Sequence, residues 1–155
     1  MARARDVVAY LFTRMQGQQG DEAPLGSTAT VLRLLRMTYL VDWRSLITRQ
    51  RALTEAQWEV DAELGPVSPE VIGAALSCVR DEPLAQRLAG QAKLSDSELK
   101  VVDFVLQACA SRPDEWVTQL VNSTFPMLGP RTSGPLNLPM LAKPYLAQRS
   151  LLMSG

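Results

Sequence analysis

Apolar side chains recur every three to four residues along most of the chain, which predicts a mainly α-helical fold. The first apolar stripe lies within residues 7–15 and ends near Gly17. A longer stripe covers residues 32–46 and follows Ser27 or Thr28, either of which can cap a helix. This second predicted helix is the longest and most apolar, so we expect it at the centre of the core.

The period changes to two at residues 57–64. There, apolar side chains alternate with Gln57, Glu59, Asp61 and Glu63. Strict alternation predicts a β-strand with one polar face. Trp58 stands at the start of this strand, and we expect it to be partly exposed.

The segment Gly65-Pro66-Val67 follows the predicted strand. Glycine allows a sharp turn and proline cannot donate to a sheet ladder, so this tripeptide ends the strand. It either forms a recognition turn at the tip of the strand or simply redirects the chain into the next helix.

Two later segments carry signals for a helix start. Ser68 followed by Pro69 is typical of an N-cap and a first helical position. Ser95 and Glu98 have the spacing of a capping box. A further short amphipathic helix, which contains Trp116, is expected after the break at residues 111–113.

The composition changes after Thr124, since five of the ten prolines lie between Pro126 and Pro144. We expect residues 126–155 to form an irregular, extended arm in which 145–153 could make a short last helix. The arm either wraps around a partner or a second copy of the chain, or it is a flexible tail. The predicted fold is therefore a compact, single-domain helical bundle with a short β element over residues 1–125, plus this proline-rich C-terminal arm.

Composition narrows the function. The 155 residues include 16 basic and 16 acidic side chains and no histidine. Zero net charge argues against coating nucleic acid or anionic lipid. Without histidine, the chain cannot build a Ser-His-Asp or Cys-His catalytic group or a histidine-ligated zinc site. Cys78 and Cys109 are expected to act as small buried hydrophobes. We expect no enzymatic activity and no cofactor.

The chain shows no targeting signal. It has neither the pattern of a signal peptide nor an apolar run approaching the ~20 residues of a membrane span. A cytoplasmic protein without a membrane partner is expected. Residues 1–56 carry a net charge of +3 and the remainder −3, a polarity that would help to orient a protein partner but is too weak to predict direct nucleic-acid binding.

Tryptophans and arginines are the candidate contact residues. Tryptophan is enriched in interface hot spots, although the spacing of Trp43 and Trp116 fits core positions equally well. Four arginines share a narrow arc if the second helix continues through residue 51. That arc is either a solvated face or a surface that holds an acidic partner or a phosphate backbone. These are Arg33, Arg36, Arg44 and Arg51.

Three carboxylates lie on the polar face of the predicted strand, at Glu59, Asp61 and Glu63. Carboxylates on one face can ligate Mg²⁺ or act in acid–base chemistry, so a metal-dependent hydrolase is one hypothesis. On a strand such residues are more commonly solubilising, and no lysine or histidine base accompanies them in the sequence.

Two stretches carry a resemblance to a known family. Residues 34–43 read LLRMTYLVDW and residues 63–71 read ELGPVSPEV, in the element order helix, strand, Gly-Pro-Val, helix. Together with residues 6–12 and 94–122, they resemble the Panacea domain, the SocA-like antitoxin domain. The sequence departs from the family pattern at Ala62, often aromatic there, and at residues 122–124, where a histidine is expected.

The resemblance implies an antitoxin that neutralises a cognate toxin by direct protein contact. The alternative is a phage or mobile-element protein that binds and inhibits a host defence complex. A homo-oligomer is also possible. The residues that we expect to contact a partner are Arg36, Trp43, Arg44, Trp58, Gly65, Pro66, Val67 and Phe125.

Overall fold

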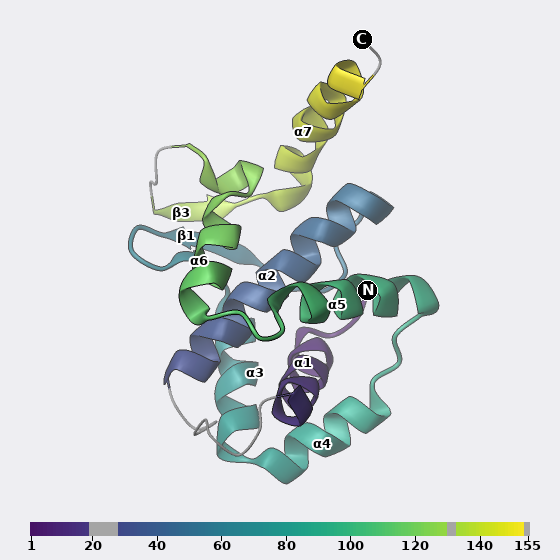
Figure 1. Ribbon diagram of the computed structural model, residues 1–155, viewed down its shortest axis with the longest axis vertical. Coiled ribbons are helices and arrows are strands. Elements are labelled where there is room, and N and C mark those ends of the chain that lie inside the picture. The colour runs from purple at the N-terminus through teal and green to yellow at the C-terminus, as the bar shows by residue number, and fades with distance from the viewer. Residues whose placement is uncertain (19–27, 130–132, 154–155) are drawn as a thin grey trace.

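The computed structural model describes residues 1–18, 28–129 and 133–153, and its longest helix, α2 (Thr28–Arg49), runs through the middle of the fold (Figure 1). Fourteen of its 22 residues are buried, which confirms that this helix forms the centre of the core. The helix begins at Thr28, and Ser27 lies outside the described residues.

The other helices pack around α2 and against one another. Helix α1 contacts α3 and α4, while α2 contacts α3, α5, α6 and α7. The bounds are α1 (Ala4–Gln18), α3 (Pro69–Arg80), α4 (Glu82–Gln91), α5 (Asp96–Cys109), α6 (Asp114–Asn122), the short 3-10 helix η1 (Phe125–Met127) and α7 (Leu138–Met153). The predicted fold class, mainly helical with a short β element, is confirmed.

Local capping signals explain where several helices begin. The Ser95 side chain accepts a hydrogen bond from the Glu98 amide, and the Glu98 carboxylate accepts one from the Ser95 amide, as the capping-box spacing predicts. Ser68 caps α3, with Pro69 in its first turn. Helix α4 was not predicted from the sequence. Its start is marked by Asp81, whose side chain accepts a hydrogen bond from the Leu84 amide.

The β element is a three-stranded antiparallel sheet in the order β2-β1-β3. Its strands are β1 (Trp58–Asp61), β2 (Gly65–Val67) and β3 (Gly134–Leu136). The tripeptide Gly65-Pro66-Val67 therefore forms the return strand of a hairpin, besides leading into α3. Because β2 is an edge strand, it tolerates Pro66, which pairs with Val60.

The prediction of one strand over residues 57–64 was wrong beyond Asp61. The Asp61 carboxylate accepts hydrogen bonds from the amides of Glu63 and Leu64, both at 2.9 Å, and so closes a turn. Leu64 consequently lies at the hairpin tip and is 41% exposed, although the alternation had placed it on the apolar face.

The prediction of an irregular, extended arm was wrong for residues 134–144, which form a strand and the first part of a helix. Strand β3 joins the sheet, with Leu136 paired to Trp58. The predicted last helix is confirmed, but it begins at Leu138 and continues through Pro144. Leu138 and Ala142 are each 3% exposed, so apolar burial attaches the start of α7 to the core. The rest of α7 extends away from the fold at the end opposite α4 (Figure 1).

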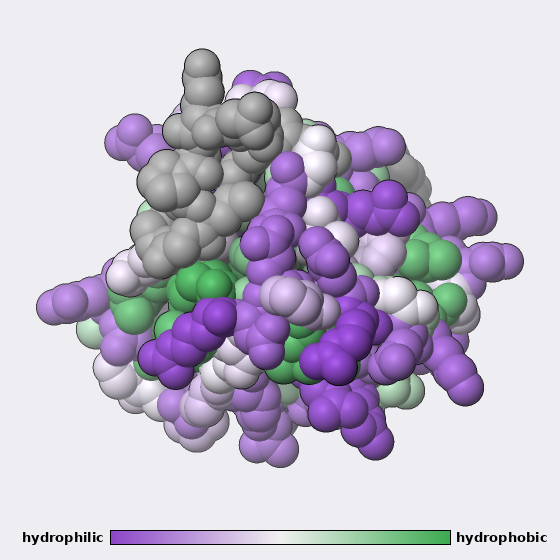
Figure 2. Space-filling model, turned by 90° about the horizontal axis from the view of Figure 1, so that it is seen from below, coloured by the Kyte–Doolittle hydropathy of each residue, from purple (hydrophilic) through white to green (hydrophobic). Residues whose placement is uncertain are grey.

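The surface at the α4 end is mainly hydrophilic outside the grey atoms, with small separate apolar patches (Figure 2). Among the described residues, no helix combines the length and apolar character that crossing a membrane requires.

Candidate partner-binding surface

A buried carboxylate organises the chain beside α2. Asp42 is 1% exposed and accepts four hydrogen bonds. The amides of Leu53 and Thr54 donate to Oδ1, while the Thr54 hydroxyl and the Trp58 indole donate to Oδ2. Burial raises the pKa of Asp42 to about 6, and these hydrogen bonds oppose the shift. Because its acceptor positions are engaged, this carboxylate holds the loop and β1 in place.

Trp58 is 5% exposed, so the expectation of partial exposure was wrong. It lies on the central strand of the sheet, and its ring meets that of Tyr39 edge to face, with the centroids 5.6 Å apart. Its indole N–H donates a hydrogen bond to Asp42 in the interior of the fold. In this conformation Trp58 stabilises the sheet against α2.

Three aromatic rings join α2, η1 and α7. Trp43 is 5% exposed, and its ring centroid lies 5.6 Å from that of Tyr145. The Phe125 ring also packs against Tyr145, and these two ring centroids are 5.5 Å apart. Two predicted contact residues therefore anchor α7 through a tyrosine that the sequence analysis missed. The prolines around Tyr145 interrupt the helical pattern that could have indicated it.

The surface next to this cluster carries an arginine stacked on an exposed ring. Cζ of Arg44 lies 3.3 Å from the centroid of the Phe104 ring, and Phe104 is 47% exposed. This is a cation–π contact between α2 and α5. Burial lowers the pKa of Arg44, and so does the positive charge of Arg149 on α7.

A hollow of about 170 Å³ lies between α2, α5 and α6 beside this arginine. Its lining is mostly apolar and includes Leu40, Trp43, Arg44, Ile47, Phe104 and Leu120. We call the hollow, together with Arg44, Phe104 and Arg149, the α2–α5 surface. It is the place where predicted contact residues meet a concave apolar site.

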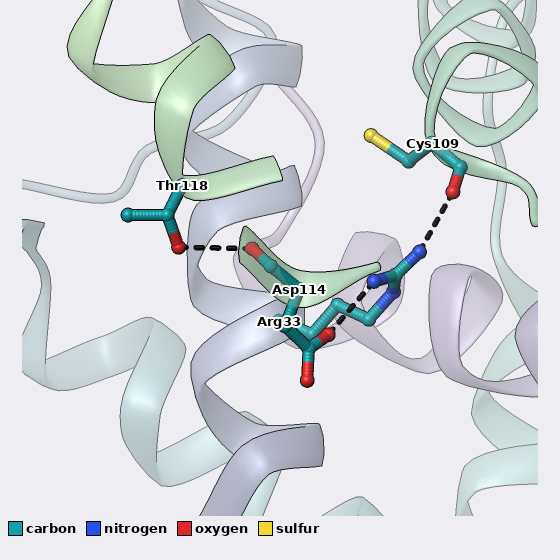
Figure 3. A network of polar contacts seen from close by, with 4 residues as sticks. All are labelled: Arg33, Cys109, Asp114 and Thr118. Carbon is teal, nitrogen blue, oxygen red and sulfur yellow. Dashed lines mark hydrogen bonds and ion pairs between the residues drawn. The ribbon is translucent and has the colours of Figure 1, made fainter. Parts of the chain in front are cut away.

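The predicted arginine arc is not a single face. Arg33 is 8% exposed and donates one hydrogen bond to the Cys109 carbonyl oxygen and one to Asp114 Oδ1, both at 2.7 Å (Figure 3). Thr118 also donates to the Asp114 carbonyl oxygen. Arg33 therefore connects α2 to the end of α5 and the start of α6, since its planar fork can serve two acceptors.

The other two arginines of the predicted arc also differ. Helix α2 ends at Arg49, and Gln50 has a φ of 61°, so the chain leaves the helix before Arg51. Arg36 remains on α2 and is half-buried. Neither residue lines the hollow, and only Arg44 of the four belongs to the α2–α5 surface.

The Gly65-Pro66-Val67 segment lies apart from this surface. Strand β2 contacts α2 but contributes no residue to the hollow. Gly65 and Pro66 are buried, and Gly65 has a φ of +86°, a conformation that favours glycine. The structure thus gives the tripeptide a role in closing the hairpin.

A second hollow, of about 390 Å³, lies beside the N-terminus, the loop before β1 and the start of α7. Its two carboxylates are already occupied: Asp42 by the four donors above and Glu55 by the Ala4 amide of α1. Gln57 and Asn137 complete its polar lining with Thr54. Both acidic side chains that line this hollow are therefore already hydrogen-bonded within the chain.

The carboxylates of the polar strand face do not converge with other ligands. Asp61 serves the hairpin turn, and Glu63 lies in that turn. Within residues 1–18, 28–129 and 133–153, no group of three or more histidine, cysteine, aspartate or glutamate side chains is placed to hold a metal ion.

Comparison of the chain with protein-family models, with curated proteins and with solved structures gave no match in any of the three.

Proposed function

We propose that this protein is an antitoxin that neutralises a cognate protein toxin by direct contact. The observation that carries the proposal is the α2–α5 surface, where the exposed ring of Phe104 and the guanidinium of Arg44 lie beside an apolar hollow. Aromatic and arginine side chains at a concave apolar site are typical of the energetic centre of protein interfaces.

The resemblance to the Panacea domain supports the same proposal. The stretch at residues 34–43 lies on α2; it ends with Trp43 and directly precedes Arg44 of the same helix. The stretch at residues 63–71 spans the hairpin turn, β2 and the start of α3. The family that these motifs resemble acts by binding toxins, which is a function of surfaces and requires no catalytic group in the antitoxin.

The reactive side chains of the described residues support a catalytic function less well than a binding function. Cys78 and Cys109 are buried, and burial raises the pKa of both thiols, that of Cys78 to about 11. A buried thiol in this state is a poor nucleophile. The buried carboxylate of Asp42 is surrounded by donors that fix the fold.

Co-expression tests the proposal. Each gene that neighbours the one encoding this chain is induced in a host, with and without this protein. We expect one neighbour to arrest growth, this protein to restore it, and the two products to co-elute in size-exclusion chromatography. Inhibition of the purified toxin by the purified chain, saturating at a fixed molar ratio, would show direct contact.

Two results would contradict the antitoxin proposal. One is that no neighbouring gene encodes a product whose toxicity this protein counteracts. The other is rescue without a complex, which would place the effect at the level of expression. Recovery of a host defence complex in place of a toxin would favour the alternative function, inhibition of host defence.

A further inference from the structure

The α2–α5 surface has the shape for an apolar side chain. The hollow of about 170 Å³ is lined by Trp43, Ile47 and Leu120, with the ring of Phe104 and the buried Cys109 on the α5 side. An apolar cavity of roughly 150 Å³ is enough to hold benzene. A leucine or phenylalanine side chain of a partner would therefore fit and would displace water from apolar lining.

The positively charged arginines beside the hollow favour a negatively charged group on the ligand. Arg44 lines the hollow, and Arg149 lies on α7, the helix that the Tyr145 ring joins to Trp43; burial is the main cause that lowers the pKa of Arg44, and the positive charge of Arg149 adds to it. The ion pairs within the described residues involve Arg5 and Arg33, and neither Arg44 nor Arg149 takes part in one. A carboxylate placed against Arg44 and Arg149 would offset positive charge there and accept hydrogen bonds in the fork geometry that arginine offers.

The surroundings favour a peptide over nucleic acid. The chain has no net charge, and the two arginines adjoin an apolar hollow, whereas nucleic-acid binding depends on many basic side chains along a phosphate backbone. A carboxylate next to an apolar side chain matches both parts of the surface at once.

We propose that the α2–α5 surface binds an acidic, apolar segment of a protein partner. One leucine or aromatic side chain of that segment enters the hollow, and a neighbouring aspartate or glutamate lies against Arg44 and Arg149. This inference rests on the proposed function in taking the partner to be a protein, and it names the chemistry that the partner presents.

A displayed library of random twelve-residue peptides, selected on the full chain, tests the inference without knowledge of the toxin. We expect the selected peptides to combine aspartate or glutamate with leucine, phenylalanine or tryptophan one to four positions away. Their affinity, measured by fluorescence anisotropy, should fall at least tenfold in Arg44→Glu and in Phe104→Ala, and it should weaken as salt is raised.

Matched variants separate binding from folding. Arg149→Glu changes an exposed side chain and should also weaken binding at least threefold without loss of stability, even if Arg44→Glu unfolds. Arg112→Glu is the control, because Arg112 also stacks on an aromatic ring, that of Trp116, with Cζ 4.9 Å from its centroid. Binding by this control should be unchanged.

Selected peptides without acidic residues, or binding that is insensitive to both Arg149→Glu and Phe104→Ala, would overturn the inference. So would a failure to select any peptide, or tighter binding of a single-stranded oligonucleotide that Arg149→Glu abolishes. Because the selection uses no toxin, a negative co-expression result with positive peptide selection would reject the antitoxin role alone.

Discussion

The indole N–H of Trp58 donates a hydrogen bond to Oδ2 of Asp42 at 2.9 Å, where both side chains are almost completely buried. The same oxygen accepts a hydrogen bond from Thr54, and Oδ1 accepts two backbone amides. One carboxylate on α2 thus determines how the following loop and the first strand are placed, and these elements in turn position β3 and the start of α7.

Replacing Asp42 with asparagine should destabilise the fold mainly through Trp58. Oδ1 would keep both amides, and the Thr54 hydroxyl can turn to accept from the new NH₂ group, but the indole N–H would face a donor. A buried unsatisfied donor costs about 1–3 kcal/mol. We expect the loss of unfolding free energy in Asp42→Asn to be in this range, measured by urea denaturation at pH 7.

A double-mutant cycle isolates that contact. Trp58→Phe removes the indole N–H, so Asp42→Asn should cost about 1–2 kcal/mol less in the Trp58→Phe background than in the wild type. Equal costs in the two backgrounds would mean that the indole hydrogen bond does not account for the effect.

The pH dependence of stability should also report on Asp42. Its pKa rises from 3.8 to about 6 on folding, so the folded chain binds the proton more tightly than the unfolded chain. The resulting stabilisation is complete below pH 3.8 and is lost as the pH rises through 6, by about 3 kcal/mol in all. Asparagine does not titrate, so Asp42→Asn should be more damaging at pH 4.5 than at pH 7.

Urea denaturation of both proteins at pH 4.5, 5.5 and 7 measures this difference. Carboxyl groups with lowered pKa, such as Asp61 and Glu70, make the opposite contribution, which is lost as the pH falls, but they are common to both proteins and cancel. A gap between wild type and variant that widens toward pH 7 would mean that the Asp42 pKa is not raised.

Arg33 should stabilise the fold through its two acceptors together. Arg33→Lys keeps the charge, but one ammonium group cannot reproduce the planar fork that reaches the Cys109 carbonyl and Asp114. We expect a loss of about 2 kcal/mol. Asp114→Asn should cost less than about 1 kcal/mol, because the Asp114 side chain is 51% exposed.

Chemical denaturation of the Arg33→Lys and Asp114→Asn variants distinguishes the two contacts. If Asp114→Asn proved as damaging as Arg33→Lys, the ion pair would be the main contribution, and the hydrogen bond to the end of α5 would be minor.

Local signals in the sequence were sufficient where structure depends on neighbours along the chain. The caps at Ser68 and Ser95 were predicted because both partners of each cap lie within three residues. Helix α4 escaped prediction because only Ala85 of its residues is buried, which leaves no clear apolar stripe. The end of β1 was missed because alternation continues to Leu64 even though the Asp61 side chain closes the turn.

Only some residues of the candidate surface could be predicted from the sequence. Trp43 and Arg44 were singled out from the composition of α2, but Phe104 and Arg149 were not. Phe104 lies off the buried stripe of α5, and its contact with Arg44 spans sixty positions in the sequence and depends on how two helices cross. Contacts of this kind follow from tertiary packing, which periodicity along one segment does not show.

Two glycines should respond in opposite ways to the same substitution. Gly65 has a φ of +86°, and an added Cβ would meet nothing within 4 Å, so the cost of Gly65→Ala is backbone strain alone. We expect a loss of about 1–2 kcal/mol. Gly73 lies in the interior of α3, where an added Cβ also meets nothing. Gly73→Ala should therefore stabilise by about 0.5–1 kcal/mol.

Thermal and urea unfolding of the Gly65→Ala and Gly73→Ala variants measure both effects, and a stable Gly65→Ala protein would show that the hairpin can adopt another turn. The same variant tests whether the hairpin and the α2–α5 surface are independent of each other. If the tripeptide only closes the hairpin, Gly65→Ala should bind the α2–α5 peptides as tightly as wild type at temperatures where it is fully folded, because β2 contributes no residue to that surface.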